Sequence, residues 1–196
     1  IFPYSIVNGK AQVLDEQELQ SNYPIGYSYL LAIKDELDTR GKQPLSPFYL
    51  YGRSQGLNKF GLRLLTPTFS QLPKFLLVEE VDSLYCNGYG LHYKQDFEGK
   101  TSLFDDNPIQ QKENVDVLQK VLNSVVMDYY VKHTSVSIQG GYPCYQKNFI
   151  ELFTIPSLSI SEIESLRQLS GKDVDSFLIN KYGLEIELTE PVPVLV

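Results

Sequence analysis

The sequence predicts an α+β protein, with a mixed β-sheet core in the middle of the chain and helices at the N-terminal and C-terminal ends. Two observations favour this class. Apolar residues recur at helical spacing near both ends of the chain, whereas short apolar runs separated by Pro, Gly and Asn fill its middle. With 42% hydrophobic and 21% charged residues, the composition is that of an ordinary globular domain.

The N-terminal elements are predicted by local signals. Residues 1–14 are typical of two short strands around Asn8-Gly9, a pair that favours tight hairpin turns. Asp15 then suits the N-cap of a helix. Pro24 suits the first turn of a renewed helix, which we expect to end at Arg40-Gly41, where a base is followed by a glycine.

The middle and the C-terminal part are predicted from apolar spacing and turn residues. We expect a helix over residues 115–131, a glycine-rich hairpin within 136–147 and a short helix over 149–153. Strands are expected at residues 62–65, 75–79, 84–86 and 91–93. Two further helices are expected over 161–169 and 173–182, the last one ended by Gly183. We therefore expect one domain over residues 1–183 and an extended tail over 184–196.

Acidic residues are missing from two stretches of the chain. Residues 39–78 contain six bases and no acid, and residues 129–150 contain Lys132, His133 and Lys147 without an acid. The remaining segments, 1–38, 79–128 and 151–196, are all acidic. The net charge of −7 argues against nucleic-acid binding. Its distribution does not, because a polyanion responds to the local field of one face.

Cysteine content and hydropathy exclude some classes of protein. The two cysteines, Cys86 and Cys144, are too few for a disulfide framework or a structural zinc site, so we expect reduced thiols in a cytoplasmic protein. No apolar run has the length that a membrane crossing needs, and we expect no membrane partner. Because the chain starts at Ile1 and its one methionine is Met127, we expect it to be a fragment of a longer protein.

The usual enzyme motifs are incomplete in this sequence. Asn107-Pro108 is followed by Ile109, so the Asn-Pro-Pro-aromatic loop of amine methyltransferases is absent. No strand runs into a glycine-rich turn and then a helix, as a nucleotide cofactor would require. Residues 98–100 resemble half of a nuclease metal site, and a solvated turn is the better interpretation. The chain offers no catalytic, cofactor or metal residues, and whether it belongs to an enzyme stays open.

Two glycine loops provide the best candidates for ligand recognition. Arg53, Ser54 and Gln55 follow Gly52 in the first loop. Arg side chains can fork onto a phosphate or a guanine edge, and Gln can pair with adenine. The second loop contains Gly140-Gly141, where the backbone can approach a ligand closely, and its candidate side chains are Gln139, Tyr142, Tyr145 and Lys147. Three bases of the first acid-free stretch are candidates for phosphate contacts: Lys59, Arg63 and Lys74.

Each of these candidates has a structural alternative. Arg53 can instead hold a loop carboxylate or backbone carbonyl groups, and Gly140-Gly141 can serve only to turn a hairpin. Lys59, Arg63 and Lys74 can be solvated charges on strands, because most lysines are solvated.

Several motifs in fixed order carry a resemblance to a known family. They are IFPY at residues 1–4, YGRSQ at 51–55, LTPTFS at 65–70 with PKF at 73–75, CNGYG at 86–90, QGGY at 139–142 and KNFIELFTIP at 147–156. With this order and spacing the chain resembles the TaqI-like C-terminal specificity domain of bacterial N6-adenine DNA methyltransferases, including fused restriction-modification enzymes. The resemblance covers about residues 1–183.

The resemblance implies a function for the fragment and for its parent. The fragment would clamp double-stranded DNA against a catalytic domain in the remainder of the parent polypeptide and read bases in the major groove. The parent would use S-adenosylmethionine to methylate an adenine flipped out of the stack, and could carry an endonuclease. No cofactor would bind in the fragment itself. The rival hypothesis is a protein-interaction module without a nucleic-acid role, to which the aromatic residues and acidic helices would contribute the surface.

Overall fold

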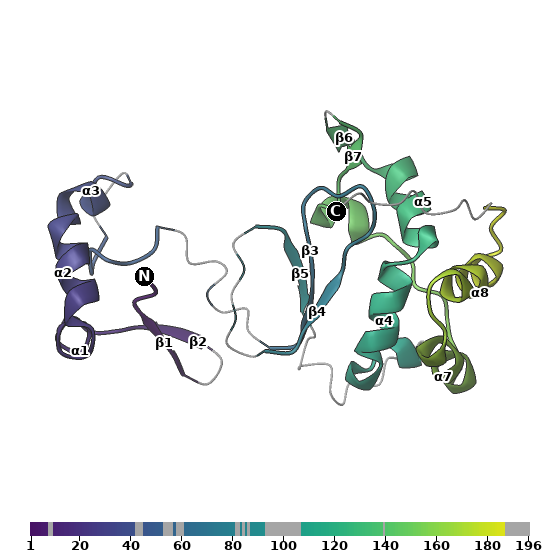
Figure 1. The fold of residues 1–196 in the computed structure, drawn as a ribbon, viewed down its shortest axis with the longest axis horizontal. Helices are drawn as coiled ribbons and strands as arrows, with labels where there is room; N and C mark the ends of the chain where they lie inside the picture. The colour runs from purple at the N-terminus through teal and green to yellow at the C-terminus, as the bar shows by residue number, and fades with distance from the viewer. Residues whose placement is uncertain are drawn as a thin grey trace. The chain divides into compact units, whose positions relative to one another are not determined.

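The computed structural model describes residues 1–7, 10–41, 45–52, 57, 61–80, 83, 85, 87–92, 107–138 and 140–186. The residues that we expected to form one domain divide into two compact units. Unit 1 comprises Ile1–Gly61 and Glu80–Cys86, and unit 2 comprises Leu62–Glu79 and Asn87–Val196. Figure 1 shows the elements of both units.

In the described residues of unit 1, a hairpin is followed by three short helices. Strands β1 (Tyr4–Val7) and β2 (Lys10–Val13) pair antiparallel, which confirms the predicted hairpin, although Asn8 and Gly9 lie outside the described residues. Helix α1 (Glu16–Asn22) is capped by Asp15, whose Oδ1 accepts the Glu18 N–H at 2.7 Å. The second predicted helix is divided at Ile33 into α2 (Pro24–Ala32) and α3 (Lys34–Asp38).

The interior of unit 1 is small and aromatic. Its cluster of buried side chains comprises Leu14, Leu19, Leu30, Phe48 and Tyr49. The Tyr49 hydroxyl donates to the Leu14 carbonyl at 2.9 Å, so the loop before residue 50 is tied to the end of the hairpin. Arg40 donates to the carbonyl oxygens of Leu37, Phe48 and Leu50. This arginine therefore closes the helical segment onto the loop.

Unit 2 contains a three-stranded sheet with the order β4–β3–β5. Strands β3 (Arg63–Thr66), β4 (Leu76–Val78) and β5 (Tyr89–His92) pair antiparallel, with Leu64 opposite Leu77 and Leu91. The α+β class is confirmed, but all described strand pairs of the chain are antiparallel, in place of the mixed sheet that we expected. The predicted strand at 84–86 lies largely outside the described residues.

The predicted helix over residues 115–131 is two helices. Helix α4 (Val115–Leu122) and helix α5 (Val125–Thr134) are separated at Asn123 and Ser124. The Asn123 side chain accepts from the Phe75 N–H and donates to the Phe75 carbonyl, while the Ser124 hydroxyl donates to the Val121 carbonyl. The Ser124 hydroxyl thus bonds to a carbonyl of the helical ladder at the break, and local side-chain bonds of this kind compete with continuation of a helix.

The remaining elements of unit 2 are short or C-terminal. Two 3₁₀ turns, η2 (Pro108–Gln110) and η3 (Lys112–Asn114), precede α4. Strands β6 (Ser137–Ile138) and β7 (Tyr142–Pro143) form the predicted glycine-rich hairpin. Helices α6 (Lys147–Ile150), α7 (Ile160–Gln168) and α8 (Lys172–Tyr182) follow, and α8 ends at Gly183 with a positive φ of 64°.

Unit 2 is layered. Helices α4 and α5 lie beside the sheet, and α7 and α8 pack against them (Figure 1). One buried cluster joins η2, α4 and α5 to α7 and α8, and a second joins the sheet to α4, α5 and Tyr145. Leu184 and Ile186 pack against the first cluster, so the start of the expected tail belongs to the core, whereas residues 187–196 lie outside the described part. None of the described helices is long and apolar enough to cross a membrane.

Candidate nucleic-acid interface

The second glycine loop forms the turn of the β6–β7 hairpin. Ile138 pairs with Tyr142, and the Gly141 N–H donates to the Ile138 carbonyl at 3.0 Å. Gly140 and Gly141 have φ angles of 95° and 75°, which side chains with a Cβ rarely adopt. A Cβ on Gly140 would also meet the Tyr142 ring at 3.2 Å. The two glycines therefore turn the hairpin.

The root of the hairpin is fixed in unit 2. The Tyr145 N–H donates to the Thr68 carbonyl at 2.8 Å, and the Ser70 N–H donates to the Pro143 carbonyl at 3.3 Å. Phe69 bridges Cys144, which is 1% exposed. The segment that follows β7 is thus bonded to residues 68–70, so the hairpin is held firmly where it leaves the core.

The hairpin itself presents apolar side chains to solvent. The exposed fractions are 59% for Val136, 45% for Ile138 and 39% for Tyr142. Exposed apolar groups gathered on one small element are typical of binding surfaces. Ile138 and Tyr142 face each other across the two strands, so they form one unit of surface.

Helix α5, which leads into the hairpin, carries two rings in contact, tilted by 34° to each other. The centroids of Tyr129 and His133 lie 4.1 Å apart. Nδ1 of His133 lies 2.7 Å from the Tyr129 carbonyl oxygen. Because a carbonyl can only accept, Nδ1 carries the proton, and Nε2 is left for another partner.

The lysines of the second acid-free stretch have acidic partners just outside it. The Lys132 ammonium lies 2.6 Å from Asp128, and the Lys147 ammonium lies 3.5 Å from Glu151. Both are helical i,i+4 pairs. Although residues 129–150 contain no acid, both of their lysines are therefore paired with an acidic side chain.

Two of the predicted contact residues are buried. Arg63 is 1% exposed and Tyr145 is 0% exposed, so neither side chain is accessible to a DNA phosphate or a base edge. Tyr145 packs edge-on against Phe75, with a centroid distance of 6.3 Å. Burial, and then the charge of Asp128, raise the pKa of the Tyr145 phenol far above its usual value. We therefore reassign Arg63 and Tyr145 to the interior of unit 2.

Lys74, Tyr142 and Lys147 remain exposed candidates. Lys74 is exposed in the loop before β4, and its ammonium has no hydrogen bond or ion pair with any residue that the structure describes. Lys147 is 76% exposed at its side chain despite its contact with Glu151. These three side chains belong to unit 2.

The remaining predicted residues cannot be placed. Arg53, Ser54, Gln55, Lys59 and Gln139 lie outside the described residues. The first four belong to the sequence range of unit 1, and Gln139 belongs to that of unit 2. Tyr51 and Gly52 are the described part of the first glycine loop, and the Tyr51 hydroxyl donates to the Ile1 carbonyl at 2.6 Å.

Sequence reasoning missed Val136 and Ile138 as surface residues. The signal was an apolar–polar–apolar alternation beside paired glycines, which predicts a strand but not which face meets solvent. Groups of three or more side chains that could hold a metal ion are absent from the described part of the chain. No protein-family model matches the chain, and no curated protein matches it.

Proposed function

We propose that this chain is a sequence-specific recognition domain for double-stranded DNA, in which the β6–β7 hairpin enters a groove. The observation that carries the proposal is the contrast between the root and the tip of this hairpin. Its root is bonded to residues 68–70, and its tip exposes Ile138 and Tyr142 beside two glycines. The DNA major groove admits a two-stranded ribbon of this kind.

Positive charge would position the hairpin on the duplex. Lys74 is exposed, and Lys147 can exchange its exposed contact with Glu151 for a phosphate at little cost, because exposed ion pairs contribute only about 0–1 kcal/mol. Phosphate contacts fix register, whereas base contacts select sequence. In the proposed division of roles, Lys74 and Lys147 bind the backbone, and the hairpin side chains meet base edges, with thymine methyl groups as partners for Ile138.

The chemistry of the parent protein is part of the same proposal. In line with the resemblance of its sequence motifs, the domain would belong to a cytoplasmic, adenine-specific DNA methyltransferase or restriction-modification enzyme. The remainder of that polypeptide would bind S-adenosylmethionine and hold the catalytic groups. The described residues of this chain would take part only in clamping and reading DNA.

Equilibrium binding tests this proposal. We expect the chain to bind a fluorescent mixed-sequence duplex weakly, at micromolar concentrations or above, because the net charge of −7 opposes approach. The slope of log K against log salt should correspond to a few phosphates, at about −0.9 for each. Ile138→Ser should weaken binding, whereas Ile160→Ser, at an isoleucine of α7 that is 68% exposed, should not.

Three results would contradict the proposal. They are tight binding without salt dependence, equal effects of the two isoleucine variants, and no binding at low salt by a chain that is folded by circular dichroism. The last result would favour the rival protein-interaction module. Incubation with labelled S-adenosylmethionine and duplex DNA adds a check on the domain assignment, because label transferred by the purified chain would place catalysis here.

A further inference from the structure

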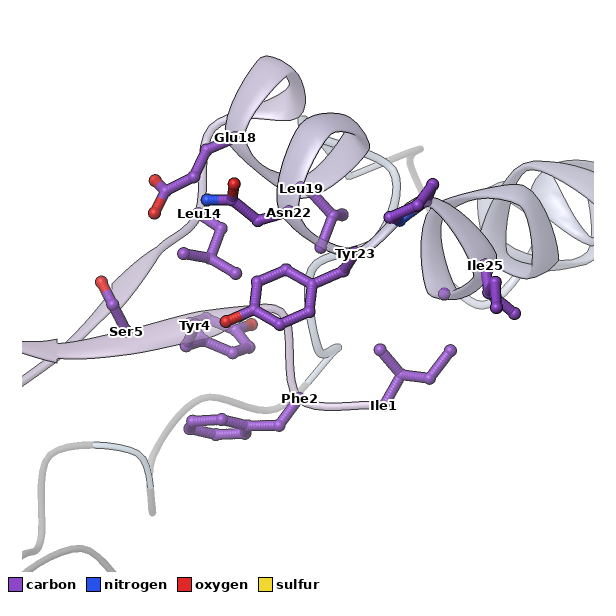
Figure 2. A pocket seen from close by; sticks show the side chains of 12 residues that line it. Ile1, Phe2, Tyr4, Ser5, Leu14, Glu18, Leu19, Asn22, Tyr23 and Ile25 are labelled. Carbon is purple, nitrogen blue, oxygen red and sulfur yellow. The ribbon is translucent and has the colours of Figure 1, made fainter.

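Unit 1 contains an open hollow between the start of the chain, the β1 strand and the junction of α1 with α2 (Figure 2). Its volume is about 670 Å³, within the range of pockets that bind small ligands or a side chain of a partner. Its lining includes Phe2, Tyr4, Glu18, Asn22, Tyr23 and Ile25.

The wall of the hollow is apolar and accessible. Leu14, Leu19 and Tyr4 are buried behind it, whereas Tyr23 is 56% exposed and Ile25 is 87% exposed. Figure 2 shows the Tyr23 ring lying between the leucine side chains and the side chains of Ile1 and Phe2. Large apolar groups in this arrangement would lose contact with water if a partner filled the space between them.

Aromatic packing holds in place the wall of the hollow that contains Phe2 and Tyr4. The Phe2 and Tyr4 ring centroids lie 5.2 Å apart, and the Tyr4 and Tyr51 centroids also lie 5.2 Å apart. The Tyr4 hydroxyl accepts the Tyr51 N–H at 2.8 Å. This part of the hollow is therefore preformed, which lowers the cost of ordering it on binding.

One edge of the hollow is polar. Ser5, Glu18 and Asn22 lie along it (Figure 2), and their side chains make no hydrogen bond or ion pair with any residue in the described ranges. The neighbouring acids of α1 are occupied, since Asp15 caps the helix and Glu16 accepts from the Tyr27 hydroxyl at 2.9 Å. Among the described side chains that line the hollow, Glu18 is the one that is charged at neutral pH.

We propose that this hollow binds a segment of a partner protein that inserts one large apolar side chain and places a neighbouring Lys or Arg against Glu18. Charge complementarity favours this occupant. Residues 1–38 contain six acids and two bases, which gives a net charge of −4. A second copy of the chain is a poorer occupant, because each copy has a net charge of −7. This inference does not depend on DNA recognition.

Fluorescence anisotropy with the full chain and three labelled peptides tests the proposal. The first peptide is a Gly-Ser sequence with Arg-Leu-Phe-Lys at its centre, the second has Glu-Leu-Phe-Asp in that position, and the third has Arg-Ala-Ala-Lys. We expect the first peptide to bind in a saturable manner and more tightly than the other two. Equal binding of all three, or no saturable binding, would overturn the proposal.

Two pairs of variants assign the binding to the hollow. Ile25→Asp should weaken the first peptide by about ten-fold or more, because it removes a large apolar contact, whereas Leu31→Asp at an exposed site of α2 outside the hollow should not. Glu18→Lys should weaken the first peptide about two- to five-fold and strengthen the acidic one. Glu36→Lys on α3 makes the same charge change away from the hollow and should do neither.

Folding and self-association are measured in parallel. All four substituted residues are exposed, so circular dichroism should show an unchanged fold. If sedimentation shows a dimer that Ile25→Asp dissociates, a second copy is the occupant and the proposal is wrong. The proposal is also wrong if both members of a pair weaken the peptide equally, because the binding site then lies elsewhere.

Discussion

The two compact units expose apolar residues on surfaces of opposite curvature. Unit 1 gathers them around a hollow with the carboxylate of Glu18 at its edge. Unit 2 carries them outward on a hairpin, whose Ile138 and Tyr142 pair across two short strands. A concave apolar surface suits a side chain of a partner protein, whereas a narrow projecting hairpin suits a groove. The two proposals therefore assign a different partner to each unit.

The two acid-free stretches also differ once they are folded. In residues 39–78, Arg40 is bonded to three carbonyl oxygens and Arg63 is buried. In residues 129–150, both lysines are exposed at the side chain but stand beside an acid four residues away. The first stretch therefore uses its described arginines to build structure, and the second keeps its lysines at the surface.

Core substitutions should show whether the two units are independent. Leu166 in unit 2 is 0% exposed and Leu19 in unit 1 is 2% exposed. Leu166→Ala should lower the free energy of unfolding of unit 2 by about 2–5 kcal/mol, and Leu19→Ala should do the same for unit 1. Hydrogen exchange measured by mass spectrometry on α2 and α8 reports each unit separately. Loss of protection in both units from either substitution would show one cooperative unit.

A buried arginine and an exposed lysine separate structure from recognition within unit 2. Arg63→Ala should lower the free energy of unfolding by about 1–3 kcal/mol, because it removes a large side chain from the interior. Lys74→Ala should change stability by no more than about 0.5 kcal/mol, and it should flatten the salt slope of DNA binding by about one phosphate. Urea denaturation and binding titrations measure both quantities. If Arg63→Ala left the free energy of unfolding unchanged, the assignment of Arg63 to the interior of unit 2 would be wrong.

Glycine substitutions test the hairpin without disturbing the core. Gly140→Ala should cost about 1–3 kcal/mol locally, because its φ is 95° and its new Cβ would press on the Tyr142 ring. Gly141→Ala has a positive φ but no neighbouring atom within 4 Å, so its cost should be smaller. Amide protection at residues 137–143 is the measurement. The turn assignment fails if both variants keep full protection.

Substitutions in the N-terminal caps of α7 and α1 should cause the smallest changes in stability. The change at α7 should depend on pH. Glu162 accepts from Lys181 and from Ser159, and these bonds lower the pKa of its carboxyl from 4.5 to about 2. Its stabilisation is therefore complete above about pH 4.5 and should be lost as the pH falls towards 2. We expect Glu162→Ala to cost about 1 kcal/mol at neutral pH and almost nothing at pH 2. Thermal melts between neutral pH and pH 2 measure this cost. Asp15→Ala, which removes the cap of α1 in unit 1, is the matched variant.

An equal destabilisation by Glu162→Ala at both ends of the pH range would show that the ion pair and cap do not act through the charged carboxylate.

Features set by neighbouring residues could be predicted from the sequence. The Asp15 cap, the Pro24 start of α2, the Gly183 end of α8 and the turn at Gly140-Gly141 all depend on backbone preferences of the residues concerned. These signals were sufficient for the α+β class and for most of the elements.

Features set by distant residues could not be predicted in this way. The apolar spacing continues across residues 123–124, but α4 ends at Leu122, next to an Asn123 side chain that bonds to Phe75, 48 residues away in the sequence. Arg63 is 1% exposed, and a formal count of charges contains no information about burial. The hollow of unit 1 was missed because it joins residues 1–5 to the junction of two helices.

Photo-cross-linking from Tyr142 tests whether the β6–β7 hairpin enters a DNA groove. The photoreactive residue p-benzoylphenylalanine would replace Tyr142 on β7 or, as a control, Tyr29 on α2, which is 58% exposed. We expect irradiation with a labelled duplex to cross-link DNA to the position of Tyr142, with a yield that falls as salt rises, and to leave the position of Tyr29 at background. Equal yields at both positions, or background yield at Tyr142 under conditions in which the chain binds the duplex, would contradict entry of the hairpin into a DNA groove.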